Sequence, residues 1–366
     1  MTKLQLDQIS WLEKCTHHVR KAGDYLPAVF FFSGFIWDAL TIGRNVNGLD
    51  LLIFAVYLLL AALILFFIAR PIPLENNTNK LVVLFRKHYA PRFPYFVLQF
   101  LFGSLFSALF ILYFKSSSHW LAWLMSLGLG VLLVANEFLE SQYKRFTLSW
   151  AMFGLCAMLL FNFALPFLIG SIHAVWFYLS TLMGAALAYW LYKNTPQHFG
   201  SIQPVGWLAG LLMLAYLVDM IPPVPLVKRE VTVAYTIDKV GRDYLLTQQA
   251  AEWWRFWRAS SDALKLLPGQ RAYCFSSVFA PAGLKTRLYH RWEHYEQKQG
   301  WKTQSRIGFD VSGGRNDGFR GYTYKQNLTV GDWRVRVETE NEKTITVYRF
   351  SVAQANVAPV TVLRHY

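Results

Sequence analysis

The first 221 residues of the chain contain seven long apolar stretches, which are separated by shorter polar connections. Each stretch is close to the roughly 20 residues that a helix needs to cross a bilayer core of about 30 Å. The sequence therefore predicts an all-α membrane bundle of seven transmembrane helices over residues 25–221. The expected helices lie at 25–42, 49–69, 94–114, 120–135, 146–169, 172–192 and 205–221.

The alternative interpretation is that these stretches are helices buried in a soluble protein. The chain is 54% apolar and only 16% charged, which is more apolar and less charged than ordinary soluble proteins. Seven such stretches in series would also need a soluble core large enough for all of them to share. The sequence therefore favours a membrane protein.

After residue 270 the apolar residues alternate with polar ones at a period of two. In the most regular segment, Trp333 and Val335 fall on one face, and Arg334 and Arg336 fall on the other. Short segments of this kind, separated by turn residues, predict an all-β sandwich of immunoglobulin-like size over residues 270–366. The expected strands are 272–279, 285–295, 301–309, 319–329, 333–340 and 344–352.

Residues 222–269 connect the two halves. Three prolines at 222, 223 and 225 predict a stiff, extended linker that holds the β domain close to the membrane. A short strand at 231–237 and a helix at 250–267 are expected to follow. The helix carries three aromatic residues that could lie at the headgroup level or pack against the β domain, namely Trp253, Trp254 and Trp257.

The distribution of basic residues predicts the orientation. The leader and the second, fourth and sixth connections would lie on the same side of the membrane, and they contain twelve Lys and Arg residues. The connections on the opposite side contain two. Positive charge is retained on the cytoplasmic side, so we expect a cytoplasmic N-terminus and, after seven spans, a periplasmic C-terminal domain. Residues 1–24 are expected to form an amphipathic helix on the cytoplasmic face, and they do not resemble a cleavable signal peptide.

The net charge of +14 is concentrated in the C-terminal region, since residues 227–366 contribute +9 of it. This surplus favours anionic partners such as lipid headgroups or acidic envelope glycans, although a solvated basic surface would have the same composition. Membrane lipids are expected partners, together with an anionic envelope glycan or a protein. Nucleic acid is not expected outside the cell membrane.

A few ionisable residues lie near the outer ends of the predicted spans. Charge at this depth is costly, so the residues deserve a functional hypothesis. We consider an outer-mouth polar cluster, and the alternative is that each side chain reaches the interface separately. The cluster would consist of Asp38, Arg44, His173 and Asp219.

On the predicted strand 285–295, His290, Trp292 and His294 alternate onto one face. The two histidines would lie about 13 Å apart at roughly 3.3 Å per residue, too far to bind one metal ion together. The row could face a ligand, as could Arg334 and Arg336, or Trp292 could pack in the core. Walker-type GxxxxGK, HExxH, CxxC and GxSxG patterns are absent, so we assign no metal, cofactor or catalytic residue.

Small residues indicate where helices approach closely. Ser180, Gly184 and Ala188 line one face of the sixth stretch, and Gly206 and Gly210 form a GxxxG pattern in the seventh. The pattern predicts close packing of these two helices, or a homo-oligomer formed through Gly206 and Gly210.

The C-terminal region contains the runs CFSSVFAP, HRW, GDWRVRVETEN and YRFSV between residues 274 and 352. This set resembles the bacterial domain of unknown function family 2914, although Asn341 and Glu342 replace a glycine-containing turn. The N-terminal run GDYLPAVFFFSGFIWDALTIGR is similar to the multi-span region often fused ahead of that domain. The resemblance implies a Gram-negative inner-membrane protein with a periplasmic β domain, and it implies no activity.

Two functional hypotheses follow. The first is a non-enzymatic membrane protein whose basic periplasmic domain binds an envelope component, which could be a glycan, a lipid headgroup or a protein. The second is a membrane enzyme or carrier that acts on a lipid-linked substrate at the outer mouth, where it would use Asp38, Arg44 and Asp219.

Overall fold

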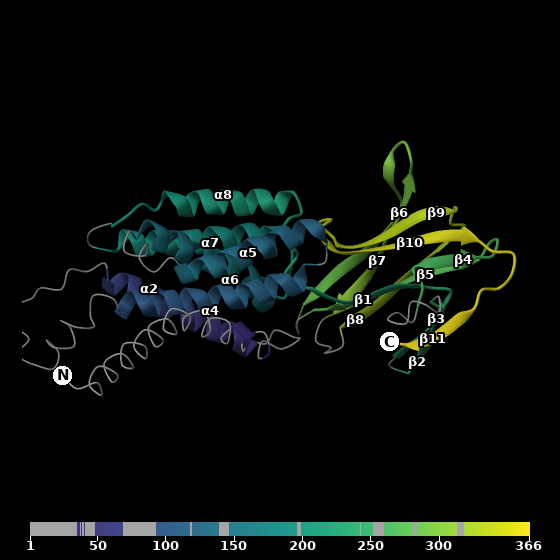
Figure 1. Cartoon of the computed structure of the whole chain (residues 1–366), viewed down its shortest axis with the longest axis horizontal. Helices are drawn as coiled ribbons and strands as arrows, with labels where there is room; N and C mark the ends of the chain where they lie inside the picture. The colour runs from purple at the N-terminus through teal and green to yellow at the C-terminus, as the bar shows by residue number, and fades with distance from the viewer. Residues whose placement is uncertain are drawn as a thin grey trace, which may run out of the picture.

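The structure is a computed structural model, in which helices gather at one end and strands at the other (Figure 1). It describes residues 35–36, 38, 40, 48–68, 93–117, 119–138, 146–195, 199–241, 243–251, 260–280, 284–312 and 318–366. Three predicted features lie outside these residues: the leader 1–24, the cluster residue Arg44, and the tryptophans Trp253, Trp254 and Trp257.

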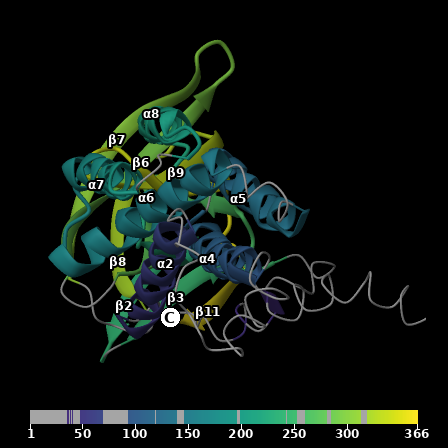
Figure 2. The same cartoon turned by 90° about the vertical axis from the view of Figure 1, so that its left-hand side faces the viewer.

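Six helices are described, and they coincide with six of the seven predicted stretches. The helices are α2 (Gly48–Ile68), α4 (Phe93–Ser116), α5 (Trp120–Phe138), α6 (Thr147–Ile169), α7 (Ala174–Lys193) and α8 (Gln203–Leu217). They lie side by side as a bundle, which Figure 2 shows from its end. In the first predicted stretch only Phe35, Ile36, Asp38 and Leu40 are described, and these are helical.

The described helices include four that are long and apolar enough to cross a membrane: α2, α4, α6 and α7. The apolar part of α5 and the whole of α8 are shorter. Outward-facing Leu, Val, Phe and Trp side chains on these helices are exposed, as expected for surfaces that contact lipid. The described residues therefore indicate a membrane protein with four helices of spanning length, and they do not support a count of seven.

Helix α7 packs most closely on α6, and its contact with α8 includes the stacked rings of Phe177 and Tyr216 and not the two glycines of α8. A Cβ at Gly184 would lie 2.6 Å from the backbone of Met158 in α6, so only glycine fits there. Gly206 and Gly210 have no atom within 4 Å of an added Cβ, and Val205 and Ala209 form the buried side of α8 instead. The prediction that the GxxxG pattern joins the last two helices is therefore wrong.

Eleven strands follow the bundle within the described residues. They are β1 (Val227–Ala234), β2 (Thr236–Val240), β3 (Asp243–Gln249), β4 (Ala263–Leu266), β5 (Arg271–Phe279), β6 (Lys285–Glu296), β7 (Gly300–Ser312), β8 (Phe319–Gln326), β9 (Gly331–Thr339), β10 (Thr344–Gln354) and β11 (Thr361–His365). They form sheets in the orders β1-β5-β8, β4-β10-β9-β6-β7 and β11-β3-β2. The C-terminal region is therefore β-rich, as predicted.

The first two sheets share one apolar core. Val233 of β1 and Cys274 of β5 pack in the same buried cluster as Trp292 of β6 and Val335 of β9. All six strands predicted after residue 270 are present, but the β region begins at Val227 and so includes much of the expected linker segment.

The predicted helix at 250–267 is wrong at its C-terminal end. Ala263–Leu266 form β4, which pairs in parallel with β10. Leu264 and Leu266 are buried and lie two residues apart, the spacing that places both on one face of a strand. Pairing with β10 and burial of these leucines outweigh the local preference for helix.

The proline linker is packed between the two halves of the molecule. Ile221 and Val224 belong to the core of the bundle, whereas Leu226 belongs to the core of the β region. The turn between β9 and β10 also contacts the end of α8. There the Lys343 ammonium donates to the Tyr216 carbonyl oxygen, and the Thr344 N–H donates to the Asp219 carboxylate at 3.2 Å. These contacts place the outer face of β9 and β10 beside the start of α5.

Candidate functional site

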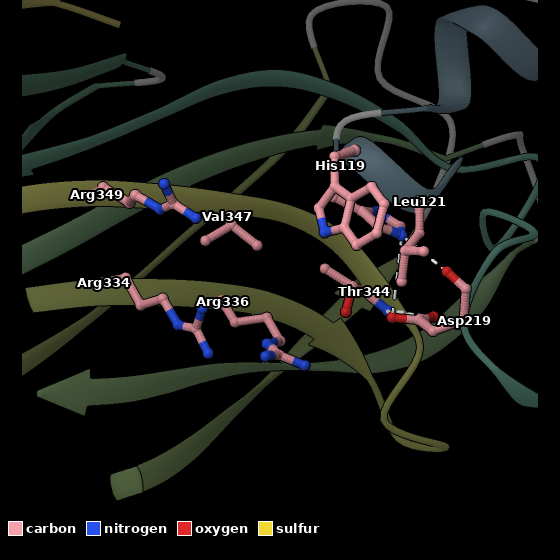
Figure 3. A pocket seen from close by; sticks show the side chains of 9 residues that line it. His119, Leu121, Asp219, Arg334, Arg336, Thr344, Val347 and Arg349 are labelled. Atoms are coloured by element: carbon pink, nitrogen blue, oxygen red, sulfur yellow. Dashed lines mark hydrogen bonds and ion pairs between the residues drawn. The ribbon is translucent and has the colours of Figure 1, made fainter. Parts of the chain in front are cut away.

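A cavity of about 450 Å³ lies where the helices meet the five-stranded sheet (Figure 3). The start of α5 and Asp219, two residues after the end of α8, form one side of it, and β9 and β10 form the other. Its lining residues are His119, Trp120, Leu121, Asp219, Arg334, Arg336, Thr344, Val347 and Arg349.

Strand alternation and register bring three arginines to this cavity. Arg334 and Arg336 alternate with the buried Trp333 and Val335 on β9, so they point to the outer face of the sheet. In the antiparallel β9–β10 pair, Arg349 lies opposite Arg334. Side chains opposite each other in such a pair share a face. Figure 3 shows the three guanidinium groups on the same side of the two strands.

One buried carboxylate holds two of these arginines. Glu293 of β6 is only 4% exposed, and its Oε2 accepts a hydrogen bond from Arg334 Nε at 2.5 Å. The same oxygen lies 3.8 Å from a terminal nitrogen of Arg336. The Arg334 guanidinium also lies 4.4 Å from the centre of the Trp301 ring. Arg334 is therefore fixed by the protein, which leaves more of the charge of Arg336 available to the cavity.

Glu338 carries the second buried carboxylate on this face, and its charge is balanced by arginines outside the cavity. Glu338 Oε1 accepts from Arg306 Nε at 2.6 Å and from Arg291 at 3.0 Å. It is therefore paired with arginines that do not line the cavity. Neither Glu338 nor Glu293 pairs with Arg349, and among the described residues no hydrogen bond or ion pair holds the Arg349 side chain. The cavity consequently has a surplus of positive charge.

Two buried nitrogen atoms beside the cavity lack hydrogen-bond partners among the described residues: Arg336 Nε and His119 Nδ1. A buried donor without an acceptor is costly, so Arg336 Nε favours a ligand that supplies an acceptor. His119 Nε2 lies 2.8 Å from the Asp219 carbonyl oxygen. Because a carbonyl oxygen only accepts, Nε2 carries the hydrogen, and Nδ1 of the neutral ring can accept from a ligand hydroxyl group.

Exposed aromatic residues lie beside the cavity. Trp120, at the start of α5, is 71% exposed, and Trp123 one turn later is 51% exposed. Exposed tryptophans at the end of an apolar helix are typical of the headgroup region of a membrane. The mouth of the cavity therefore lies beside exposed aromatic side chains at the end of an apolar helix.

The predicted outer-mouth cluster does not form a single site. Asp38 accepts a hydrogen bond from Ser107 of α4 at 2.6 Å, and His173 caps the N-terminus of its own helix, α7. Asp219 lines the cavity, whereas Arg44 lies outside the described residues. Asp38 and His173 therefore have separate local partners, as in the alternative interpretation that each side chain acts separately.

The row His290, Trp292 and His294 faces the core. The suggestion that this row faces a ligand is therefore corrected. His290 and Trp292 are fully buried. The His290 ring bonds with Ser276 at 2.8 Å and with Thr323 at 2.9 Å, and Trp292 donates to the same threonine. His294 packs on the Trp333 ring. Burial lowers the pKa of His290 to about 3, so its ring is neutral at ordinary pH.

The strands that carry the three arginines also carry the similarity to known sequences. The model of the family described as "Protein of unknown function (DUF2914)" matches residues 285–352. The DUF2914 match runs from β6 into β10 and includes Arg334, Arg336 and Arg349. It confirms the expected resemblance for this part of the chain and does not extend to the helices. A search of the curated proteins finds no match.

Solved structures offer only weak similarity beyond the DUF2914 match. An immunoglobulin-like protein from Pseudomonas aeruginosa is 10% identical, with a TM-score of 0.19. The aligned region covers 33% of this chain and 96% of the Pseudomonas protein. A β-glucosidase from Listeria innocua in complex with gluconolactone is 9% identical, with a TM-score of 0.19. The aligned region covers 31% of this chain and only 16% of the length of the glucosidase. These TM-scores are too low to establish a shared fold.

The site combines residues that the sequence indicated with others that it did not. Arg334, Arg336 and Asp219 were candidate residues, and all three line the cavity. Arg349 was missed, although the antiparallel pairing of the last two predicted strands places it opposite Arg334. His119 has no local signal that would connect it to β9 or β10.

Proposed function

We propose that this protein binds the phosphate-bearing headgroup of a membrane lipid in the cavity between α5 and strands β9 and β10. The observation that carries the proposal is a pair of arginines that keep hydrogen-bond donors available to the cavity. Arg336 Nε is buried without an acceptor, and no described residue pairs with Arg349. A phosphate oxygen satisfies both, since guanidinium groups bind phosphate through charge-assisted hydrogen bonds.

The electrostatics of the whole region support an anionic ligand. Residues 227–366 carry +9 of the net charge of +14. This field attracts anions to the region, and the arginines on β9 and β10 then bind the phosphate locally. A cavity that opens beside exposed tryptophans is accessible to a lipid that remains in its bilayer.

The proposal includes a placement in the cell. The protein lies in the bacterial inner membrane, where its apolar helices anchor it. The N-terminus is cytoplasmic and the β region is periplasmic, which is supported by the twelve basic residues on one side against two on the other. A homo-oligomer through Gly206 and Gly210 is compatible with the open space beside them.

This orientation is tested with a cysteine introduced at Lys298, in the exposed turn between β6 and β7. The native Cys15 is replaced by serine in this variant, and the native Cys156 and Cys274 are buried and should react little. A thiol reagent that cannot cross the inner membrane is expected to label the Lys298→Cys protein in cells with a permeabilised outer membrane. Labelling only after the inner membrane is lysed would place the β region in the cytoplasm and refute the orientation.

The binding proposal predicts that Arg349→Gln weakens binding of short-chain phosphatidylglycerol to the full chain in neutral detergent by about tenfold. That loss corresponds to roughly 1.4 kcal/mol, within the range for one charge-assisted hydrogen bond. Arg349 is exposed and no described residue pairs with it, so the substitution should leave the fold intact. Titration of the lipid against intrinsic tryptophan fluorescence measures the effect.

The matched control is Arg287→Gln, which removes the same charge from the same sheet. Arg287 is paired with the exposed Asp310 and does not line the cavity. Binding equal to that of the wild type is expected. If Arg287→Gln and Arg349→Gln weaken binding equally, binding depends only on the net charge of the protein and the proposed site is wrong.

The alternative hypothesis, a membrane enzyme or carrier, required Asp38, Arg44 and Asp219 at one outer mouth. Asp38 instead bonds to Ser107, and Asp219 bonds to the turn between β9 and β10. No observation on the described residues favours that hypothesis over headgroup binding, so we do not develop it.

A further inference from the structure

A second cavity, of about 510 Å³, continues from the first along β10. The two cavities share Arg349, so groups bound on either side of this guanidinium can belong to one ligand. Val347 lines the first cavity and Ser351 lines the second. These residues are about 13 Å apart along the strand at roughly 3.3 Å per residue. The second cavity therefore lies farther from the helices than the first.

The second cavity differs from the first in its chemistry. It is lined by the Trp301 ring, by the carboxylates of Asp262 and Asp332, and by the hydroxyl groups of Ser261 and Ser351. Asp262 accepts a hydrogen bond from Tyr348 at 2.9 Å. Asp332 is exposed, and no described residue donates to it. Trp333 and Phe350 also line the cavity but are buried, so Trp301 is its accessible aromatic residue. The lining has several hydrogen-bond acceptors, and only one of its residues is cationic.

These groups select against a second phosphate. The two carboxylates repel an anion, and Arg349 together with the nearby Arg334 reduces their attraction for a cation. A neutral group with many hydroxyls fits better, because each hydroxyl can donate to a carboxylate while the C–H face of its ring packs on an aromatic side chain. That description is met by a sugar. The cavity volume is also within the usual range for a small-molecule site.

We infer that the two cavities together bind a glycolipid whose sugar is attached to its lipid through a phosphate or diphosphate. The phosphate lies between Arg336 and Arg349, and the sugar lies against Trp301 and Asp332. The inference rests on the proposed function, and it adds the class of headgroup. A lipid phosphate without a sugar fills the first cavity alone and binds more weakly.

The test compares two probes on the full chain in neutral detergent: a short polyprenyl diphosphate, and the same lipid carrying one N-acetylglucosamine. The glycosylated lipid is expected to bind at least about tenfold more tightly. Asp332→Asn should remove most of this gain without weakening binding of the sugar-free lipid. Asp310→Asn, which removes an exposed carboxylate outside both cavities, is the matched control and should leave both affinities unchanged.

The possible results separate the two proposals. Equal affinity for the two lipids, with binding that still depends on Arg349, would refute the sugar site and leave the headgroup proposal standing. Binding of neither lipid, or binding that does not respond to Arg349→Gln, would refute both. A gain from the sugar that Asp332→Asn does not reduce would place the sugar elsewhere and overturn the assignment of the second cavity.

Discussion

Replacing Arg336 and Arg349 together by glutamine is expected to weaken binding of anionic lipid about 100-fold. Each substitution removes one charge-assisted hydrogen bond of roughly 1.5 kcal/mol, and two such losses correspond to about two orders of magnitude in affinity. Binding of diacylglycerol, which has no phosphate, should change far less. The preference of the protein for phosphate-bearing over phosphate-free lipid should therefore almost disappear.

This double variant is designed to keep the sheet intact. Arg334 remains and continues to pair with the buried Glu293 at 2.5 Å, so no carboxylate is left without a partner in the interior. Removing Arg334 as well would isolate that carboxylate, and a buried unpaired charge costs several kcal/mol. The thermal unfolding midpoint of the double variant in detergent should stay close to that of the wild type. Wild-type lipid selectivity in a folded double variant would contradict the proposal.

The second large effect concerns the buried histidine of the β core. His290 has a pKa of about 3 in the folded protein because burial disfavours its charged form, whereas an unfolded histidine titrates near 6.5. The unfolded state therefore binds more protons between these values. Stability due to the neutral ring is fully present above about pH 6.5 and is lost as the pH falls toward 3.

The expected slope is about 1.4 kcal/mol of unfolding free energy per pH unit from this one residue. His290→Gln should be less stable than the wild type at pH 7, because the hydrogen bonds to Ser276 and Thr323 change. Its stability should nevertheless fall less steeply between pH 6 and pH 4. Urea unfolding at several pH values measures the difference. The exposed His365→Gln is the control, and equal slopes for His290→Gln and the wild type would contradict the buried, neutral assignment.

Apolar patterning predicts the elements of this protein well where burial follows the sequence locally. The helices α2 and α6 and the strands β6 and β9 lie where their periodicity placed them, because each buries one side or its whole length. The pattern fails at β4, where Leu264 and Leu266 pair with β10, almost 90 residues away in the chain. A four-residue strand has too few positions to show its period.

The strands β2, β3 and β11 were missed for a related reason. They form a separate three-stranded sheet whose core within the described residues is small, centred on Ala234, Leu246 and Phe275. A strand such as β2, which buries little, shows a weak apolar period. Its pairing with β3 is a property of the folded chain.

The site was only partly predictable because its residues come from both halves of the molecule. Strand alternation identifies the outward direction of Arg334 and Arg336, and register adds Arg349. The position of His119 beside them depends on how the buried linker and the contact between Asp219 and Thr344 orient the sheet on the helices. Ionisable residues near span ends suggested a cluster, but Asp38 and His173 are used within the bundle.

The central claim is that an anionic lipid headgroup occupies the cavity beside α5. The most direct measurement places a photoreactive phenylalanine derivative at position Val347, which lines the cavity, and crosslinks the full chain in native membranes. Mass spectrometry then identifies the adducts, with position Lys298 in the β6–β7 turn as the control. We predict a phosphate-containing lipid adduct at Val347 that is lost when Arg336 and Arg349 are glutamine. An equal yield at Lys298, or a yield unaffected by the two arginines, would contradict the account.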